Sequence, residues 1–84
     1  METFYMVVTL SSLTAPHTLF YSHPERWVNQ TACVHELPRM EAAVARLIRY
    51  DASTLALFGT VTGGPLNSGL FVTASECWSA EPLP

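Results

Sequence analysis

One segment of the chain has the pattern of an amphipathic helix, and it limits what the rest of the chain can build around it. Residues 36–51 read "ELPRMEAAVARLIRYD", in which apolar residues recur at helical spacing: Leu37, Met40, Val44, Leu47 and Ile48. Pro38 suits the first turn of a helix, where its missing N–H would have no partner in any case. Because the other readable segments alternate as strands do, this single helix has to cover one face of a sheet.

Four segments alternate between two sets of side chains and are rich in β-branched and aromatic residues: 3–10, 17–22, 54–62 and 69–78. Residues 23–35 follow neither pattern, and we expect a loop there with a short extended piece. The sequence therefore predicts an α+β fold with a four-stranded antiparallel sheet, β-β-α-β-β, in which the helix joins two hairpins and packs on one face. We expect residues 1–84 to form a single domain, with residues 79–84 as a flexible tail.

The balance of charges excludes some classes of partner. The chain carries seven carboxylates, four arginines and no lysine, which gives a formal net charge of −3. Direct nucleic-acid binding relies on Lys and Arg contacts to phosphate, so this balance argues against it. The start of the chain lacks the basic segment of a signal peptide, and no stretch approaches the roughly 20 apolar residues of a membrane span. We therefore expect a cytoplasmic protein.

The stretch "FGTVTGGPLNSGLFVT", residues 58–73, is the most motif-like in the chain. A phosphate-binding loop opens into a helix and has a lysine close behind it. Here a strand pattern follows the glycines, and the chain has no lysine. We interpret the stretch as a turn between two strands.

Other patterns of catalysis or metal binding are incomplete. "HELPR" at residues 35–39 has Arg39 where the zinc-protease helix motif needs its second histidine. The pair Cys33-x-His35 could begin a metal site, but structural zinc sites usually present two such pairs. Cys33 and Cys77 could form a disulfide, although in a cytoplasmic chain we expect free thiols. The sequence predicts no enzyme activity, no metal and no cofactor.

Two surfaces are candidates for protein contacts. If the helix covers the aliphatic face of the sheet, an aromatic face stays open, and we expect Tyr5, Tyr21 and Phe71 to serve self-association there, most simply in a homodimer. The alternative is that residues 23–35 fold over this face and close the core. A second surface would set acidic side chains against a basic partner, and the partner-binding residues expected there are Glu25, Trp27, Glu36, Glu41 and Asp51.

The overall profile resembles the small phage-encoded inhibitors known as anti-CRISPR proteins. The shared features are a chain of only 84 residues, net acidity, no catalytic signature and a sheet with one helix such as "ELPRMEAAVARLIRYD". The resemblance implies a stoichiometric inhibitor that binds a type I CRISPR effector complex, with a basic nucleic-acid-binding groove as the expected contact, and blocks target DNA binding or cleavage. The class has no common motif, so the resemblance assigns no residue a role. The alternative is a homo-oligomeric structural or assembly protein of phage or bacterial origin.

Overall fold

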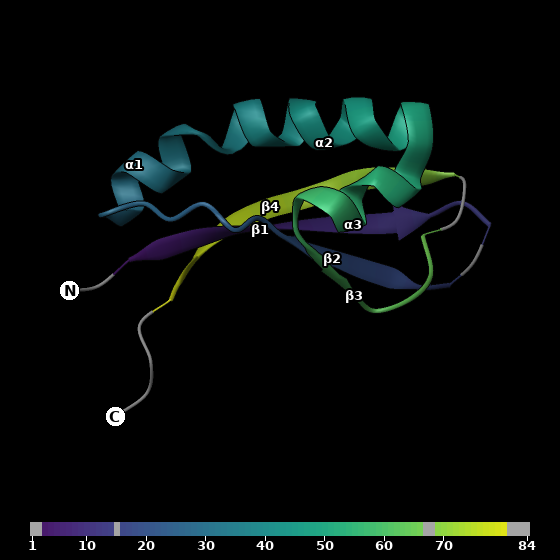
Figure 1. Ribbon diagram of the computed structural model, residues 1–84, viewed down its shortest axis with the longest axis horizontal. Coiled ribbons are helices and arrows are strands. Elements are labelled where there is room, and N and C mark those ends of the chain that lie inside the picture. The colour runs from purple at the N-terminus through teal and green to yellow at the C-terminus, as the bar shows by residue number, and fades with distance from the viewer. Residues whose placement is uncertain (1–2, 15, 67–68, 81–84) are drawn as a thin grey trace.

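The computed structural model describes residues 3–14, 16–66 and 69–80, and it confirms the α+β fold expected from the sequence. Four strands form one antiparallel sheet with helices packed on it (Figure 1). In chain order the elements are β1 (Phe4–Ser12), β2 (Thr18–Ser22), α1 (Gln30–His35), α2 (Leu37–Asp51), the 3-10 turn η1 (Ala52–Thr54), α3 (Leu55–Phe58), β3 (Thr60–Thr62) and β4 (Leu70–Ser79). The expected helix and the first, second and last expected strands are present, with small shifts at their ends.

The strands lie in the order β3-β2-β1-β4, and each neighbouring pair is antiparallel. β1 and β2 form the first expected hairpin. The expectation of a second hairpin is wrong, because β3 pairs with β2 while β4 pairs with β1. The glycine-rich connection does join two strands, but it runs from one edge of the sheet to the other. Gly63 and Gly69 in it have φ angles of 105° and 80°, which glycine adopts without steric cost.

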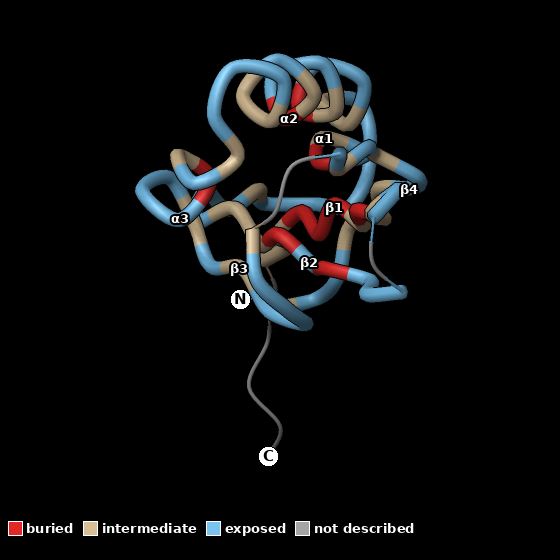
Figure 2. Tube along the Cα trace, turned by 90° about the vertical axis from the view of Figure 1, so that its right-hand side faces the viewer, coloured by how far each residue is buried: buried red, intermediate tan, exposed pale blue. Residues whose placement is uncertain are grey.

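Helix α2 forms where the sequence predicts it and packs its apolar side on the sheet. Pro38 lies in its first turn, and Met40 and Val44 are buried. Figure 2 shows the buried residues of α2 turned toward the strands below it. The helix ends at Asp51, whose side chain accepts a hydrogen bond from the backbone N–H of Ser53 at 3.1 Å and thereby caps the following turn.

Residues 23–35 are more ordered than the loop expected from the sequence, since they contain helix α1. The side chain of Asn29 caps this helix by accepting a hydrogen bond from the backbone N–H of Ala32 at 2.7 Å. The expected extended piece is at Trp27, which exchanges two backbone hydrogen bonds of 2.9 Å with Phe4 of β1. Helix α1 lies with α2 on one side of the sheet (Figure 2). Residues 30–35 therefore do not cover the other face, and from the preceding segment the guanidinium of Arg26 reaches it, over the Tyr5 ring.

The strand expected over residues 54–62 is mostly helical. Only Thr60–Thr62 form β3, and Leu55–Phe58 form the short helix α3 instead. Leu55 is fully buried, whereas Phe58, the last residue of the helix, is 54% exposed. The pattern was ambiguous because four consecutive residues, "LALF", fit a strand and a helical turn equally well.

The core lies between the sheet and the helices. Its buried members are Met6, Val8, Leu10, Leu19, Tyr21, Cys33, Met40, Val44 and Leu55. The prediction that Tyr21 lies on the open side of the sheet is wrong. The pairing of β2 with β1 sets Tyr21 opposite Val8 and Leu19 opposite Leu10, and cross-strand partners share a face. Tyr21 is only 2% exposed.

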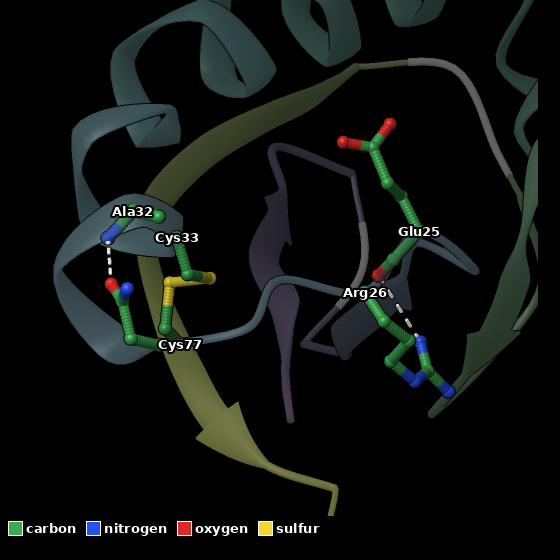
Figure 3. Close-up of a disulfide and its surroundings, with 6 residues drawn as sticks. Glu25, Arg26, Ala32, Cys33 and Cys77 are labelled. Carbon is green, nitrogen blue, oxygen red and sulfur yellow. Dashed lines mark hydrogen bonds between the residues drawn. A yellow bond between two sulfur atoms is a disulfide. The ribbon is translucent and has the colours of Figure 1, made fainter. Parts of the chain in front are cut away.

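Cys33 and Cys77 form a disulfide between α1 and β4 (Figure 3). The Cα atoms are 6.2 Å apart, and Cys33 is fully buried. The expectation of free thiols is therefore wrong. It rested on the assumed compartment, whereas the fold brings two cysteines 44 positions apart in the chain to one place.

Ser79, expected to begin a flexible tail, belongs to the sheet instead. Strand β4 includes Ser79, and the backbone N–H of Ala80 donates to the carbonyl oxygen of Thr3 at 2.8 Å. Residues 81–84 lie outside the described part of the chain. Within that part, none of the helices has the length and apolar character needed to cross a membrane.

Candidate interaction surface

The side of the sheet that faces away from α2 presents an apolar surface with almost no charge. Strand pairing places on it the side chains of Tyr5, Val7, Thr9, Ser11, Thr18, Phe20, Ser22, Thr60, Thr62, Phe71, Ala74, Glu76 and Trp78. We call these residues the open sheet face. Glu76 is the one charged residue in the four strands of the described chain. A partner would meet aromatic rings, hydroxyl groups, a single carboxylate and, at one end, the guanidinium of Arg26 over the Tyr5 ring.

Three of its aromatic side chains are exposed far more than core residues are. Phe20 and Phe71 are each 41% exposed, and Trp78 is 48% exposed. Buried aromatic side chains contribute strongly to packing, so leaving three of them in water forgoes much of the available stabilisation. Tyrosine, tryptophan and phenylalanine are enriched where proteins contact one another. The open sheet face therefore has the composition of an interface.

The rings at one end of this face are held in a defined arrangement. Tyr5 and Trp78 are cross-strand partners, and their ring centroids lie 6.5 Å apart at 62°, an edge-to-face contact. The guanidinium carbon of Arg26 lies 5.0 Å from the centroid of the Tyr5 ring. Arg26 is itself held by hydrogen bonds from Nη1 to the carbonyl oxygens of Pro24 and Glu25, the latter drawn in Figure 3. The Tyr5–Trp78 end of the open sheet face therefore has its side chains held in place before a partner binds.

A hollow of 230 Å³ lies toward the Tyr5–Trp78 end of the open sheet face. Its walls are Tyr5, Phe20 and Trp78, and Val7 lies at its floor with 4% exposure. Hot spots of protein interfaces are commonly single large side chains seated in such hollows. The hollow gives the surface a place to receive one apolar side chain of a partner.

The sequence analysis identified part of this surface. Tyr5 and Phe71 lie on it as expected, whereas Tyr21 does not, because it is buried under α2. Phe20 and Trp78 were missed as contact residues. The signal for Phe20 was available, since its neighbours on the same side of β2 are Thr18 and Ser22, and a face with a threonine and a serine tends to be the solvent side.

The acidic residues expected to bind a partner do not come together in one patch. Glu25 and Glu36 both lie near Arg39, and Glu36 forms an ion pair with its Nε at 2.6 Å. Glu41 follows Glu36 by five positions, which turns it by roughly 140° around the helix. Asp51 is at the far end of α2, about 22 Å along the helix axis from Glu36, and its carboxylate is engaged in capping.

Trp27, the remaining expected partner residue, contributes more to the fold than to a surface. Its ring is half-buried against the core cluster, and its backbone extends β1 through the pairing with Phe4. We therefore assign Trp27 a structural role in holding the segment before α1 to the sheet.

The described residues do not include a group of three or more histidine, cysteine, aspartate or glutamate side chains that could hold a metal ion. Comparison with known protein families, with curated proteins and with solved structures found no match. The surface is therefore interpreted from its own residues.

Proposed function

We propose that this protein is a non-enzymatic binding protein whose main contact surface is the open sheet face. The observation that supports the proposal is the exposure of Phe20, Phe71 and Trp78 on strands that carry a single charge. Apolar patches beyond a few hundred Å² are uncommon on monomers and mark interaction sites.

A second copy of the chain is the occupant that fits this face best. A two-fold interface brings the same surface together from both subunits, so it suits a face that needs no opposite charge on the partner. Two such sheets can pack about 10 Å apart with their side chains interleaved. Glu76 and Arg26 lie on the same surface, and in a two-fold pair the arginine of one subunit can approach the carboxylate of the other.

Measurement of the molar mass in solution by light scattering tests this assignment. We expect about twice the chain mass of 9.3 kDa for the protein. Trp78→Ser should give monomers because it removes an anchor of the interface, while Leu57→Ser on α3, where the leucine is 81% exposed, should leave the mass unchanged. A monomer at every concentration contradicts self-association, and large open oligomers support the alternative of a structural or assembly protein.

The partner class suggested by the sequence resemblance is a type I CRISPR effector complex, which this protein would inhibit. In a dimer built on the open sheet face, Glu36, Glu41 and Asp51 stay outside the interface, because α2 lies on the opposite side of the sheet, and Glu25 lies beside Arg39 of that helix. They would then be available for a basic surface of the effector.

A pull-down on purified type I complexes, with target-DNA binding measured in parallel, tests this second step. Stoichiometric retention with loss of DNA binding supports an inhibitor. Glu36→Lys together with Glu41→Lys should weaken retention, whereas Glu76→Gln on the sheet should not. Lack of retention on the complexes tested, with the dimer intact, contradicts the anti-CRISPR assignment and leaves self-association standing.

The compartment is a separate question. An inhibitor of this kind acts in the cytoplasm, whereas the Cys33–Cys77 disulfide is typical of an oxidising compartment. Alkylation of protein from freshly lysed cells, followed by intact-mass measurement, distinguishes the two. Modified thiols favour the cytoplasm, and an unmodified chain favours an oxidising compartment.

A further inference from the structure

A second hollow lies on the helix side of the molecule, between α2, α3 and the end of β2. It has a volume of 350 Å³, and we call it the helix-side groove. Met40, Leu47 and Phe58 contribute to its apolar lining, and His23, Glu25 and Arg46 contribute polar groups. The volume lies at the lower end of the range for small-molecule sites, roughly 300–1,000 Å³.

The apolar lining offers one exposed aromatic ring and a deeper aliphatic floor. Phe58 is 54% exposed, and Met40 is 7% exposed. An apolar body of a ligand placed here would cover the phenylalanine ring and remove both surfaces from water. The groove therefore favours a ligand with a substantial apolar part.

One guanidinium in the groove, that of Arg46, forms no ion pair with the described residues. Four charged or titratable groups line it besides the Tyr21 hydroxyl: His23, Glu25, Arg39 and Arg46. Arg39 is occupied by Glu36, whose Oε2 lies 2.6 Å from its Nε. Within the described residues no ion pair forms at Arg46. A guanidinium matches a carboxylate with two parallel hydrogen bonds, and a single one matches a single carboxylate.

Two groups of the groove, the His23 ring and the Tyr21 hydroxyl, have pKa values shifted by burial toward their uncharged forms. Burial lowers the pKa of His23, with Glu25 opposing the shift and Arg39 and Arg26 adding to it. The backbone N–H of Glu25 donates to Nδ1 of His23 at 3.2 Å, so Nε2 carries the proton of the neutral ring. Burial also raises the pKa of the Tyr21 hydroxyl. An apolar ligand body can cover these two groups without desolvating an ionised side chain.

We propose that the helix-side groove binds a small monocarboxylic acid, with its carboxylate on Arg46 and its apolar body along Met40 and Phe58. A ligand of about a dozen non-hydrogen atoms fits 350 Å³, if each takes no more than the roughly 30 Å³ of a water molecule. Arg39 and Arg46 are seven positions apart, about 10 Å along α2, so the body reaches from Arg46 toward the His23 end. The site is independent of the open sheet face.

The test uses three probes with one apolar body and different head groups: 4-phenylbutyrate, its uncharged amide and 4-phenylbutylamine. Each is titrated into the isotopically labelled protein, and binding is followed by NMR chemical shifts of Phe58 and the α2 amides. We expect the acid to bind about tenfold more tightly than the amide, because only the acid makes charge-assisted hydrogen bonds. The amine should bind most weakly.

Arg46→Gln should reduce the affinity for the acid about tenfold and leave the affinity for the amide unchanged. Arg49→Gln is the matched control, since Arg49 is also exposed on α2 but does not line the groove. Phe58→Ala should weaken all three probes. Equal affinity for acid and amide, an equal loss in both arginine variants, or the absence of shifts at Phe58 with the acid each overturns the proposal.

Discussion

Gly59 lies between α3 and β3 at a place where a side chain has no room. A Cβ atom there would be 2.7 Å from Cε1 of Tyr21 and still closer to the carbonyl oxygen of Ser22. The ring of Tyr21 is fixed in the core, so neither neighbour can move away easily. Gly59 therefore allows β3 to approach β2, and its role is steric.

We expect Gly59→Ala to reduce the free energy of unfolding by about 2 kcal/mol, the typical cost of overpacking. Gly64→Ala is the control, because its Cβ would first meet the exposed His17 side chain at 3.4 Å. That change should stay within about 0.5 kcal/mol. Urea unfolding of both variants measures the difference, and equal effects would contradict the steric explanation.

His23 makes the stability of the fold depend on pH. Burial lowers its pKa in the folded protein below the usual value of 6.5, so near that pH the unfolded chain binds more protons than the folded one. The contribution is fully present above pH 6.5 and is lost as the pH falls through the lower pKa of the folded state. Protonation of Nδ1 would also remove the hydrogen bond from the Glu25 N–H.

We therefore expect the unfolding midpoint in urea to decrease between pH 7.5 and pH 5.5, and the decrease to be smaller in His23→Gln. Midpoints at a series of pH values measure this difference. Identical slopes for the two proteins would show that His23 does not contribute.

How well the open sheet face could be predicted depended on which side of the sheet Tyr21 of β2 occupies. Alternation assigns Leu19 and Tyr21 to one side and Phe20 to the other, but it does not say which side is buried. Grouping the aromatic residues on one face sets Tyr21 toward solvent, whereas Tyr21 is buried because it pairs with Val8, whose side chain faces the core. Tyr5 and Phe71 lie on the open face because β1 and β4 turn their other set of side chains toward the helices.

At the scale of elements, α1 depends on the rest of the fold for its stability. It has six residues, and isolated helices of that length are not stable in water. The Asn29 cap, the buried Cys33 and the disulfide to β4 supply what the local sequence lacks. This is why a helix over residues 30–35 is hard to predict from the sequence, although the pattern of the longer α2 is clear.

Loss of the disulfide should destabilise the protein by about 4 kcal/mol, from the chain entropy of a closed loop of 44 residues. The variant with Cys33→Ser and Cys77→Ser should unfold at the same denaturant concentration as the reduced protein. Hydrogen exchange should become faster in residues 30–35 than in α2. Unchanged stability after reduction would contradict this role of the disulfide.

The segment over residues 54–62 shows where tertiary contacts override a local pattern. Asp51 and Ser53 begin a new turn after α2 through side-chain hydrogen bonds of 2.7 and 3.1 Å. That turn carries Leu55 into the core, and the chain then stays helical until Gly59. Neither the capping nor the position of the core is visible in the alternation of "LALF".

For the whole molecule, self-association and stability should be linked. A chain of this size buries only about 60% of the surface that its unfolded form exposes, so a second copy on the open sheet face would add substantially to its core. If dimerisation is coupled to folding, each tenfold increase in protein concentration should add about 1.4 kcal/mol of stability. Thermal unfolding over a range of concentrations measures this. Phe71→Ser should abolish the dependence, and a concentration-independent midpoint for the unmodified protein contradicts the coupling.

The pairing of β1 with β4 also has a consequence for how the chain reaches its fold. Val7 and Glu76 are partners across 69 positions, so one side of the central strand stays without its neighbour until β4 has been synthesised. Hairpin formation between β1 and β2 is local and fast, whereas this closing step is long-range and slow. Until it occurs, the apolar strand β1 has an open edge on the ribosome. Nascent chains that stop before β4 should therefore recruit chaperones or aggregate, and those that include it should not.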